Sequence, residues 1–172
     1  MKIEVIKGSV VDASADAIVN AANENLLMGG GVCGAIFQAA GIKELTEACR
    51  KLGHCDTGAA VITPAFNLKS KYIIHAVGPV YTGKTIDADL LSSAYGCSLF
   101  LADIHKCKSI AFCCISTGIY GYPLEEASVL AVREVLEYIP KSLEKVQFYC
   151  YTDREYEVYT RLINSVNELL GE

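Results

Sequence analysis

The chain alternates along its length between short apolar segments typical of strands and longer amphipathic segments typical of helices. The strand-like segments are residues 3–6, 17–22, 61–63, 72–77, 110–115 and 146–151. The helical segments are residues 34–40, 44–52 and 87–104, a stretch that opens at Pro123, and a last stretch from Thr152 to Gly171. Strands separated by helices form a mostly parallel sheet with helices on both faces. We therefore predict an α/β fold, a three-layer α/β/α sandwich around a mostly parallel mixed sheet, and one domain over residues 1–172.

The last helix has the clearest start and end signals. Thr152 followed by Glu155 is the pattern of a capping box, in which each side chain accepts a hydrogen bond from the backbone N–H of the other residue. An apolar stripe at helical spacing follows, made of Tyr156, Tyr159, Leu162, Ile163, Val166, Leu169 and Leu170. Gly171 is a typical residue after the last turn of a helix.

Composition and charge restrict the partners. Apolar residues make up 52% of the chain and charged residues 20%, which is enough apolar surface for a sizeable core. No uncharged apolar run approaches the ~18 residues of a membrane span, and the first residues carry no secretory signal, so we expect a soluble, cytoplasmic, monomeric protein. The net charge of −5 and the lack of a basic cluster argue against non-specific nucleic-acid binding. A phosphate compound would have to be held by backbone amides and helix ends.

The eight cysteines suggest disulfides or a metal site at first sight. The chain has no Cys-x-x-Cys pair and no export signal, so we expect reduced thiols. Cys49, His54 and Cys55 offer three zinc ligands, but a fourth is missing. We predict no metal and no cofactor.

Residues 29–34 match the glycine pattern of dinucleotide-binding folds. In those folds the first glycine follows a strand directly, and a second strand about twenty residues later ends in an acidic residue. Here residues 23–28 separate the glycines from the strand, and residues 35–55 are predicted to be helical. The dinucleotide hypothesis is therefore disfavoured.

Residues 78–85 match the pattern of the phosphate-binding loop of NTPases, which would end in Gly83, Lys84 and Thr85. Such a loop needs small residues whose amides point inward. Pro79 has no amide, and the two residues after it are bulky. A small NTPase that uses Gly83, Lys84 and Thr85 is a remote alternative.

A third interpretation combines two loops. Residues 20–23 with the glycines at 29–31 form the first, and residues 116–123 form the second. Each loop follows an apolar strand and precedes a helix, so both present backbone amides at the same edge of the sheet. Two such loops can enclose a diphosphate, with asparagine side chains available for ribose hydroxyls.

The residues of these loops give the chain a resemblance to the macro domain, a module that recognises ADP-ribose. The resemblance covers nearly the whole chain and rests on four motifs in family order, at residues 16–23, 29–36, 72–79 and 115–123. It implies the macro domain fold, and ADP-ribose, a derivative of it, or an ADP-ribosylated protein as the partner.

Carried over by position, the resemblance implies a set of ligand-binding residues. Asn23 would contact the distal ribose, Asn20 would support its loop, and Tyr120 would flank that ribose. Tyr151 would stack on or flank the adenine. The residues implied to hold the diphosphate are Gly30, Gly31, Val32, Ser116, Thr117, Gly118, Ile119 and Tyr120.

Two positions depart from the family pattern. Ser9 and Val10 stand where the family usually has Asp-Ile, whose acid accepts a hydrogen bond from the adenine amino group. A serine can still accept that bond, but loss of the charge would weaken it by about 1 to 2 kcal/mol. Cys33 stands where relatives that hydrolyse ADP-ribosyl esters commonly have Asp, as a base or a water-positioning group. Loss of a general base typically lowers a rate by ~10²- to 10⁴-fold.

The sequence therefore leaves two related functions open. The chain either binds ADP-ribose and hydrolyses ADP-ribosyl esters weakly, with Asn23 and Cys33 as candidate catalytic residues, or it binds without hydrolysis. A nucleophilic Cys33 at its helix start is the less favoured form of the first function. His75 lies in an apolar strand, where a hydrogen-bonded core histidine is the favoured interpretation over a catalytic base.

Overall fold

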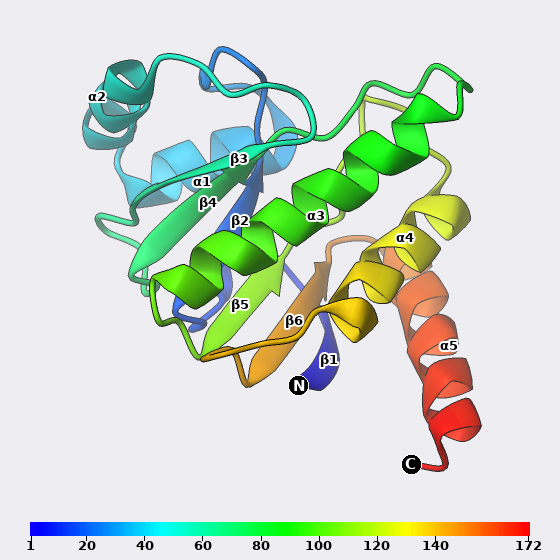
Figure 1. Cartoon of the computed structure of the whole chain (residues 1–172). Helices are drawn as coiled ribbons and strands as arrows, with labels where there is room; N and C mark the ends of the chain where they lie inside the picture. Colours follow the sequence, from blue (N-terminus) through cyan, green and yellow to red (C-terminus); the bar gives the residue numbers. More distant parts are fainter.

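A six-stranded sheet forms the centre of the computed structural model, which describes all residues from 1 to 172 (Figure 1). The strand order is β1-β6-β5-β2-β4-β3, and only β3, at one edge, runs antiparallel to its neighbour β4. The strands are β1 (Lys2–Lys7), β2 (Ala17–Ala21), β3 (Ala60–Pro64), β4 (Tyr72–Ala76), β5 (Ser109–Phe112) and β6 (Lys145–Cys150). The predicted mostly parallel, mixed sheet is confirmed.

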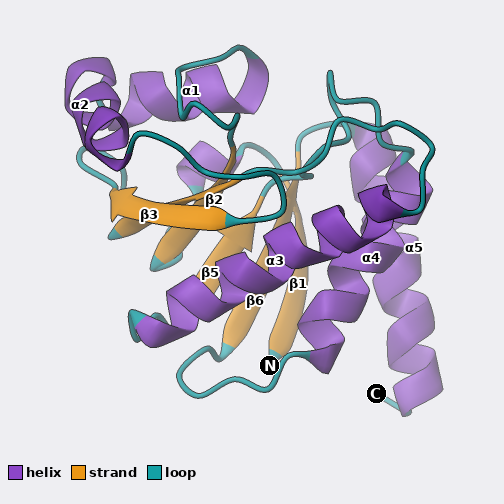
Figure 2. Cartoon of the chain, turned by 45° about the horizontal axis from the view of Figure 1, so that its top comes forward, coloured by secondary structure: helices purple, strands orange, loops and turns teal.

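Five α-helices and one short 3₁₀ helix connect the strands. They are η1 (Val10–Asp12), α1 (Gly31–Ala40), α2 (Ile42–Leu52), α3 (Ile86–Ile104), α4 (Leu124–Glu137) and α5 (Asp153–Leu170). Helix α1 packs on β2 and α2 on β3, whereas α3 packs on β3, β4 and β5. Figures 1 and 2 show α3 across one face of the sheet and α1 beyond the other, so the three-layer prediction is confirmed. None of the helices combines the length and the apolar character that a membrane span requires.

The core is continuous across the sheet and contains a chain of four aromatic rings. Tyr95 of α3, Phe112 of β5, Phe148 of β6 and Tyr159 of α5 have successive ring centroids 5.0, 5.9 and 4.9 Å apart. Each of these side chains is essentially inaccessible to solvent. Because aromatic burial contributes more free energy than that of smaller side chains, these contacts fix α3 and α5 against the middle of the sheet.

Most predicted elements occur within two residues of their expected bounds, and the capping box of α5 is present as predicted. Two bounds differ. Residues 113–115, predicted as strand, lie beyond the end of β5, because the chain leaves the sheet there and the N–H of Ile115 donates to the hydroxyl of Tyr95. Helix α1 begins at Gly31 instead of residue 34, so its first turn includes a glycine whose poor helix propensity argues for a loop there.

Asp103, at the C-terminal end of α3, organises the segment that leads into β6. Its buried carboxylate accepts hydrogen bonds from the backbone N–H groups of Lys141, Ser142 and Leu143 at 2.8, 2.7 and 2.9 Å, and from the Tyr138 hydroxyl at 3.0 Å. Burial opposes ionisation of this carboxyl, but the three amides outweigh it and hold its pKa well below the usual range. One side chain therefore satisfies the backbone of a whole turn.

Removing this carboxylate should destabilise the fold. In Asp103→Ala three backbone amides, one of them on buried Leu143, lose their acceptor, so we expect the free energy of unfolding in urea at pH 7 to fall by about 3 kcal/mol. Asp89→Ala removes an exposed carboxylate from the first turn of the same helix and should change it by less than about 1 kcal/mol. Equal effects of the two substitutions would contradict this account.

Candidate ligand-binding site

The two loops singled out in the sequence lie at the same edge of the sheet. The first follows β2 and leads into α1, and the second follows β5 and leads into α4. Strands β2 and β5 are parallel neighbours, with Ala17 paired to Ile110. Because parallel strands end at the same edge, the two loops emerge next to each other, as predicted.

The first loop is closed by the side chain of Asn23. Its Nδ2 donates to the carbonyl of Leu27 at 2.8 Å, and its Oδ1 accepts from the N–H of Leu27 at 3.0 Å. The loop then folds back on α1, where a Cβ at Gly34 would lie 2.7 Å from the carbonyl oxygen of Gly29. The absence of a side chain at Gly34 is therefore required for this close approach.

The loop ends in four backbone amides without an acceptor in the chain, those of residues 30–33 at the start of α1. Gly31 has φ +55°, and a Cβ at Gly30 or Gly31 would meet no atom within 4 Å, so these glycines present an open stretch of backbone. Unpaired amides at a helix N-terminus form a ready anion-binding site.

The second loop presents another run of unpaired amides. Its inner bonds run from the N–H of Tyr122 to the carbonyl of Ser116 and from that of Gly121 to Gly118, and the five N–H groups of residues 116–120 have no acceptor in the chain. Ser116 adopts φ +67°, which turns the chain sharply away from the sheet. Ile119, at the tip, is fully exposed. The carbonyl of Tyr120 accepts from the N–H of Tyr81 at 2.8 Å, which ties this loop to the one after β4.

Ser9, Val10 and Tyr151 lie together at the ends of the neighbouring strands β1 and β6, where the N–H of Gly8 donates to the carbonyl of Cys150. The hydroxyl of Ser9 caps η1 by accepting from the N–H of Val11 at 3.4 Å, and Val10 is buried. Tyr151 is 76% exposed, so its ring is free to contact a ligand and is not part of the core.

Cys33 faces the inside of the first loop and is only 6% exposed. Its Sγ lies 3.4 Å from the N–H of Gly29, 3.7 Å from Nδ2 of Asn20 and 3.8 Å from the carbonyl of Leu27. All three contacts are to the loop or to the end of β2. The thiol therefore anchors the loop from within.

Asn20 and His75 continue this contact into the sheet. They are direct partners in β2 and β4, each 1% exposed, with Asn20 Nδ2 and His75 Nδ1 3.1 Å apart. On its other side His75 Nε2 lies 3.0 Å from the hydroxyl of Thr63 in β3. Burial lowers the pKa of His75 to about 4, so the imidazole is neutral at pH 7. The predicted hydrogen-bonded core histidine is confirmed, but its contact with Asn20 was missed, since only the register of β2 and β4 brings them together.

The loop after β4 does not form a phosphate-binding loop. The carboxylate of Asp87 accepts from the N–H groups of Thr82 and Gly83 at 2.8 and 2.9 Å, so an anion of the chain itself occupies the amides that would face a phosphate. Lys84 is exposed. This arrangement removes the basis of the NTPase alternative.

No convergent zinc site forms around Cys49, His54 and Cys55. Cys49 Sγ lies 3.9 Å from His75 Nε2, whereas His54 is exposed and contacts Asp56. Glu24, His54 and Asp56 bring three exposed ligand atoms within 4.8 Å of one another, but Glu24 is already bonded to the N–H of Thr57. These contacts link the first loop to the segment before β3. All eight cysteines are free thiols.

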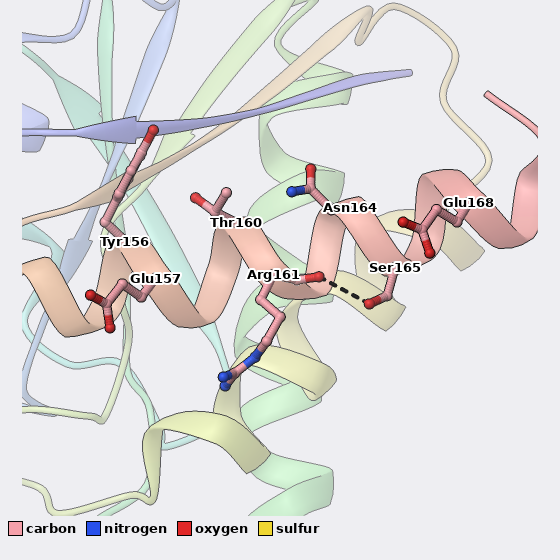
Figure 3. Close-up of a pocket in the computed structure, with 7 residues that line it drawn as sticks. All are labelled: Tyr156, Glu157, Thr160, Arg161, Asn164, Ser165 and Glu168. Carbon is pink, nitrogen blue, oxygen red and sulfur yellow. Dashed lines mark hydrogen bonds between the residues drawn. The ribbon is translucent and has the colours of Figure 1, made fainter.

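A separate depression lies along α5, away from the loops (Figure 3). Its lining comes from this single helix and is polar apart from Tyr156. The labelled side chains of Figure 3 project from one helix without a facing wall, so they cannot enclose a ligand.

Comparison with known proteins bears directly on the two loops, because a family model described as "Macro domain" matches residues 19–131, which include both. The chain belongs to the macro domain family. It is 50% identical to the macro domain-containing protein TTE0995 of Caldanaerobacter subterraneus, with 97% of this chain and 98% of that protein covered. It is 47% identical to a Salmonella typhimurium protein named O-acetyl-ADP-ribose deacetylase, with 94% of both chains covered.

Solved structures agree with the family. An Oceanobacillus iheyensis macrodomain mutant with ADPR matches with a TM-score of 0.91 and 35% identity over 96% of this chain and 94% of that chain. A Trypanosoma brucei macrodomain in complex with ADP-ribose matches with a TM-score of 0.86 and 40% identity over 94% of this chain and 68% of that chain. Ser9, Val10 and Tyr151 lie outside the part of this macro domain that the family model matches.

Gly78 tests how tightly the second loop packs. A Cβ at Gly78 would lie 2.1 Å from Ser116 Oγ and 2.5 Å from Ile115 Cγ2, both buried, so Gly78→Ala should displace the loop and lower the free energy of unfolding by about 2 kcal/mol. Gly118→Ala, where a Cβ would meet nothing within 4 Å, should change it by no more than about 0.5 kcal/mol. Urea unfolding of both variants provides the measurement. If Gly78→Ala is as stable as wild type, Ser116 and Ile115 do not pack tightly against Gly78.

Proposed function

We propose that this macro domain binds ADP-ribose and holds its diphosphate between the two loops. The observation that carries the proposal is the pair of unpaired amide runs, residues 30–33 and 116–120, at one edge of the sheet. Amides attract phosphate locally and need no positive side chain, which suits a chain with a net charge of −5. Relatives whose structures contain ADP-ribose share this fold.

We propose that the adenine and the distal ribose of ADP-ribose lie on opposite sides of the diphosphate. The adenine would lie toward Ser9, Val10 and Tyr151, where an exposed aromatic ring is available for stacking. The distal ribose would lie toward Asn23 and Tyr120. A hydroxyl at Ser9 supplies a neutral acceptor, so adenine selectivity should be lower than with a carboxylate there.

We further propose weak hydrolysis of ADP-ribosyl esters, either O-acetyl-ADP-ribose or a mono-ADP-ribosylated protein. The 47% identical relatives that carry the name O-acetyl-ADP-ribose deacetylase support this proposal. In such a hydrolysis water adds to the ester carbonyl, and the carboxylic acid and ADP-ribose are released. Cys33 is buried and bonded within its loop, so a weak reaction or binding alone is expected. A single-domain, cytoplasmic monomer that needs no cofactor remains our prediction.

Binding can be tested with ligands that differ in one phosphate. Isothermal titration of the intact chain should show binding of ADP-ribose and of ADP, and an affinity for AMP lower by at least ~10-fold, because one phosphate can occupy only part of the amide cradle. ADP-ribose, and not Mg-ATP, should raise the melting temperature. An absence of heat and of thermal shift with millimolar ADP-ribose would refute the proposed function.

Turnover separates the hydrolase from the binder. In Cys33→Asp a carboxylate would meet the two N–H donors that now face the thiol, and we expect release of acetate from O-acetyl-ADP-ribose to rise by ~10-fold or more. Cys33→Ser keeps a donor and acceptor there and should leave the wild-type rate within about threefold. A Cys33→Ser protein that binds ADP-ribose but has lost all turnover would instead identify the thiol as the nucleophile.

A further inference from the structure

Four buried polar side chains form a continuous row beneath the first loop. The row runs from Thr63 in β3 through His75 in β4 and Asn20 in β2 to Cys33 in α1, and every member is at most 6% exposed. Successive polar atoms are 3.0, 3.1 and 3.7 Å apart. We call these four residues the polar row. Buried polar groups are costly unless they are paired. Each side chain in the row therefore constrains the orientation of the next one.

The hydrogen bonds of Asn20 fix the direction of the donors along the row. With Asn20 Nδ2 facing both His75 Nδ1 and Cys33 Sγ, its two protons have two acceptors, and Oδ1 is the one atom of the side chain without a partner. The flipped amide would leave two donors unpaired, which is worse. His75 Nδ1 is therefore an acceptor, and because the imidazole is neutral, Nε2 carries the proton and donates to Thr63.

Other groups around the imidazole do not compete with this arrangement. Cys49 of α2 lies 3.9 Å from His75 Nε2, and Thr63 and Asn20 face the ring from the adjacent strands. None of the three carries a charge at pH 7 in these surroundings, since burial raises the pKa of Cys49 to about 11. The tautomer of His75 is thus set by Thr63 on one side and by Asn20 on the other.

At the far end of the row, Cys33 contacts both Asn20 and the backbone of the first loop. Its sulfur accepts from Asn20 Nδ2 and from the N–H of Gly29, and its S–H is directed to the carbonyl of Leu27. Leu27 is held a second time by Asn23. The amides of residues 30–33 follow directly on this anchored segment, so their direction depends on where Cys33 is held.

We propose that His75 is a positioning residue for the ligand loop, acting through Asn20 and Cys33. The acceptor at Nδ1 orients the Asn20 amide, and the amide holds the thiol that anchors residues 27–33. The effect on ligand affinity rests on the proposed ADP-ribose function, whereas the effect on Cys33 does not. A core histidine that only fills space would need the volume of the ring but no acceptor at Nδ1.

Two substitutions separate the acceptor from the ring. His75→Asn places an amide oxygen near the former position of Nδ1, so Asn20 keeps an acceptor. The longer side chain of His75→Gln places its amide near Thr63, so Asn20 loses its acceptor at the position of Nδ1. Both remove the ring, so their losses of stability in urea should be similar. We expect ADP-ribose affinity within about threefold of wild type for His75→Asn and a weakening of about tenfold for His75→Gln.

A second readout does not depend on any ligand. The rate of Cys33 alkylation by iodoacetamide, measured by peptide mass spectrometry, should rise about fivefold or more in His75→Gln and stay near the wild-type rate in His75→Asn. Cys97, half-buried on α3 and outside the polar row, is the internal control and should be unchanged. A general loosening of the fold would accelerate both cysteines.

Each outcome decides the proposal. Equal Cys33 alkylation in wild type and folded His75→Gln, or equal changes in both variants, would overturn it in favour of ring packing. If neither variant folds, Asn20→Leu leaves His75 in place and removes the amide that links it to Cys33, and an unchanged rate of Cys33 alkylation there would overturn the proposal. Wild-type protein that fails to bind ADP-ribose would refute the proposed function, while the alkylation contrast would still test the positioning role.

Discussion

Unpaired backbone amides at the carboxyl edge of the sheet are the constraint on which the site depends. Nine N–H groups in two loops, residues 30–33 and 116–120, have no acceptor within the chain, and such groups are stable only where water or an anion can reach them. The parallel arrangement of β2 and β5 places both runs on one edge. A site built in this way would attract an anion through dipoles, so the net negative charge of the chain is compatible with the proposed phosphate site.

Close packing beneath the loops holds these amides in direction. Gly78 lets Ser116 approach the end of β4 to a distance that no side chain would permit, and Ser116 accepts an unfavourable backbone conformation there. Tyr95 supplies the next contact, because its buried hydroxyl accepts from the N–H of Ile115. The second loop is thus held by one strand end and by helix α3, while the first is held by its own thiol.

Much of the fold was predicted from periodicity, and the candidate site was inferred from motifs whose order resembles that of one family. The alternation of strand and helix segments predicted the layers because each element buries an apolar face of recognisable period. The contacts that align the site were not predictable in the same way. Asn20 and His75 meet only through the register of β2 and β4, and Asp87 meets the amides of Thr82 and Gly83 only because the loop turns back on α3. Sequence patterns locate residues on elements, but the first of these contacts depends on how two strands align and the second on the conformation of the turn just before α3.

Cys33, which stands where the resemblance to macro domains implies an Asp, also has a structural role. A buried carboxylate needs strong donors, and Asn20 Nδ2 and the N–H of Gly29 already point at this position. The sulfur accepts from the same two donors, and the S–H contacts the carbonyl of Leu27, which a carboxylate would repel. Where the resemblance implies a group that could orient water, this chain has one that ties down the loop. The neutral row of Thr63, His75 and Asn20 suits the second role, since an orienting chain without charge holds its geometry across the pH range in which the imidazole stays neutral.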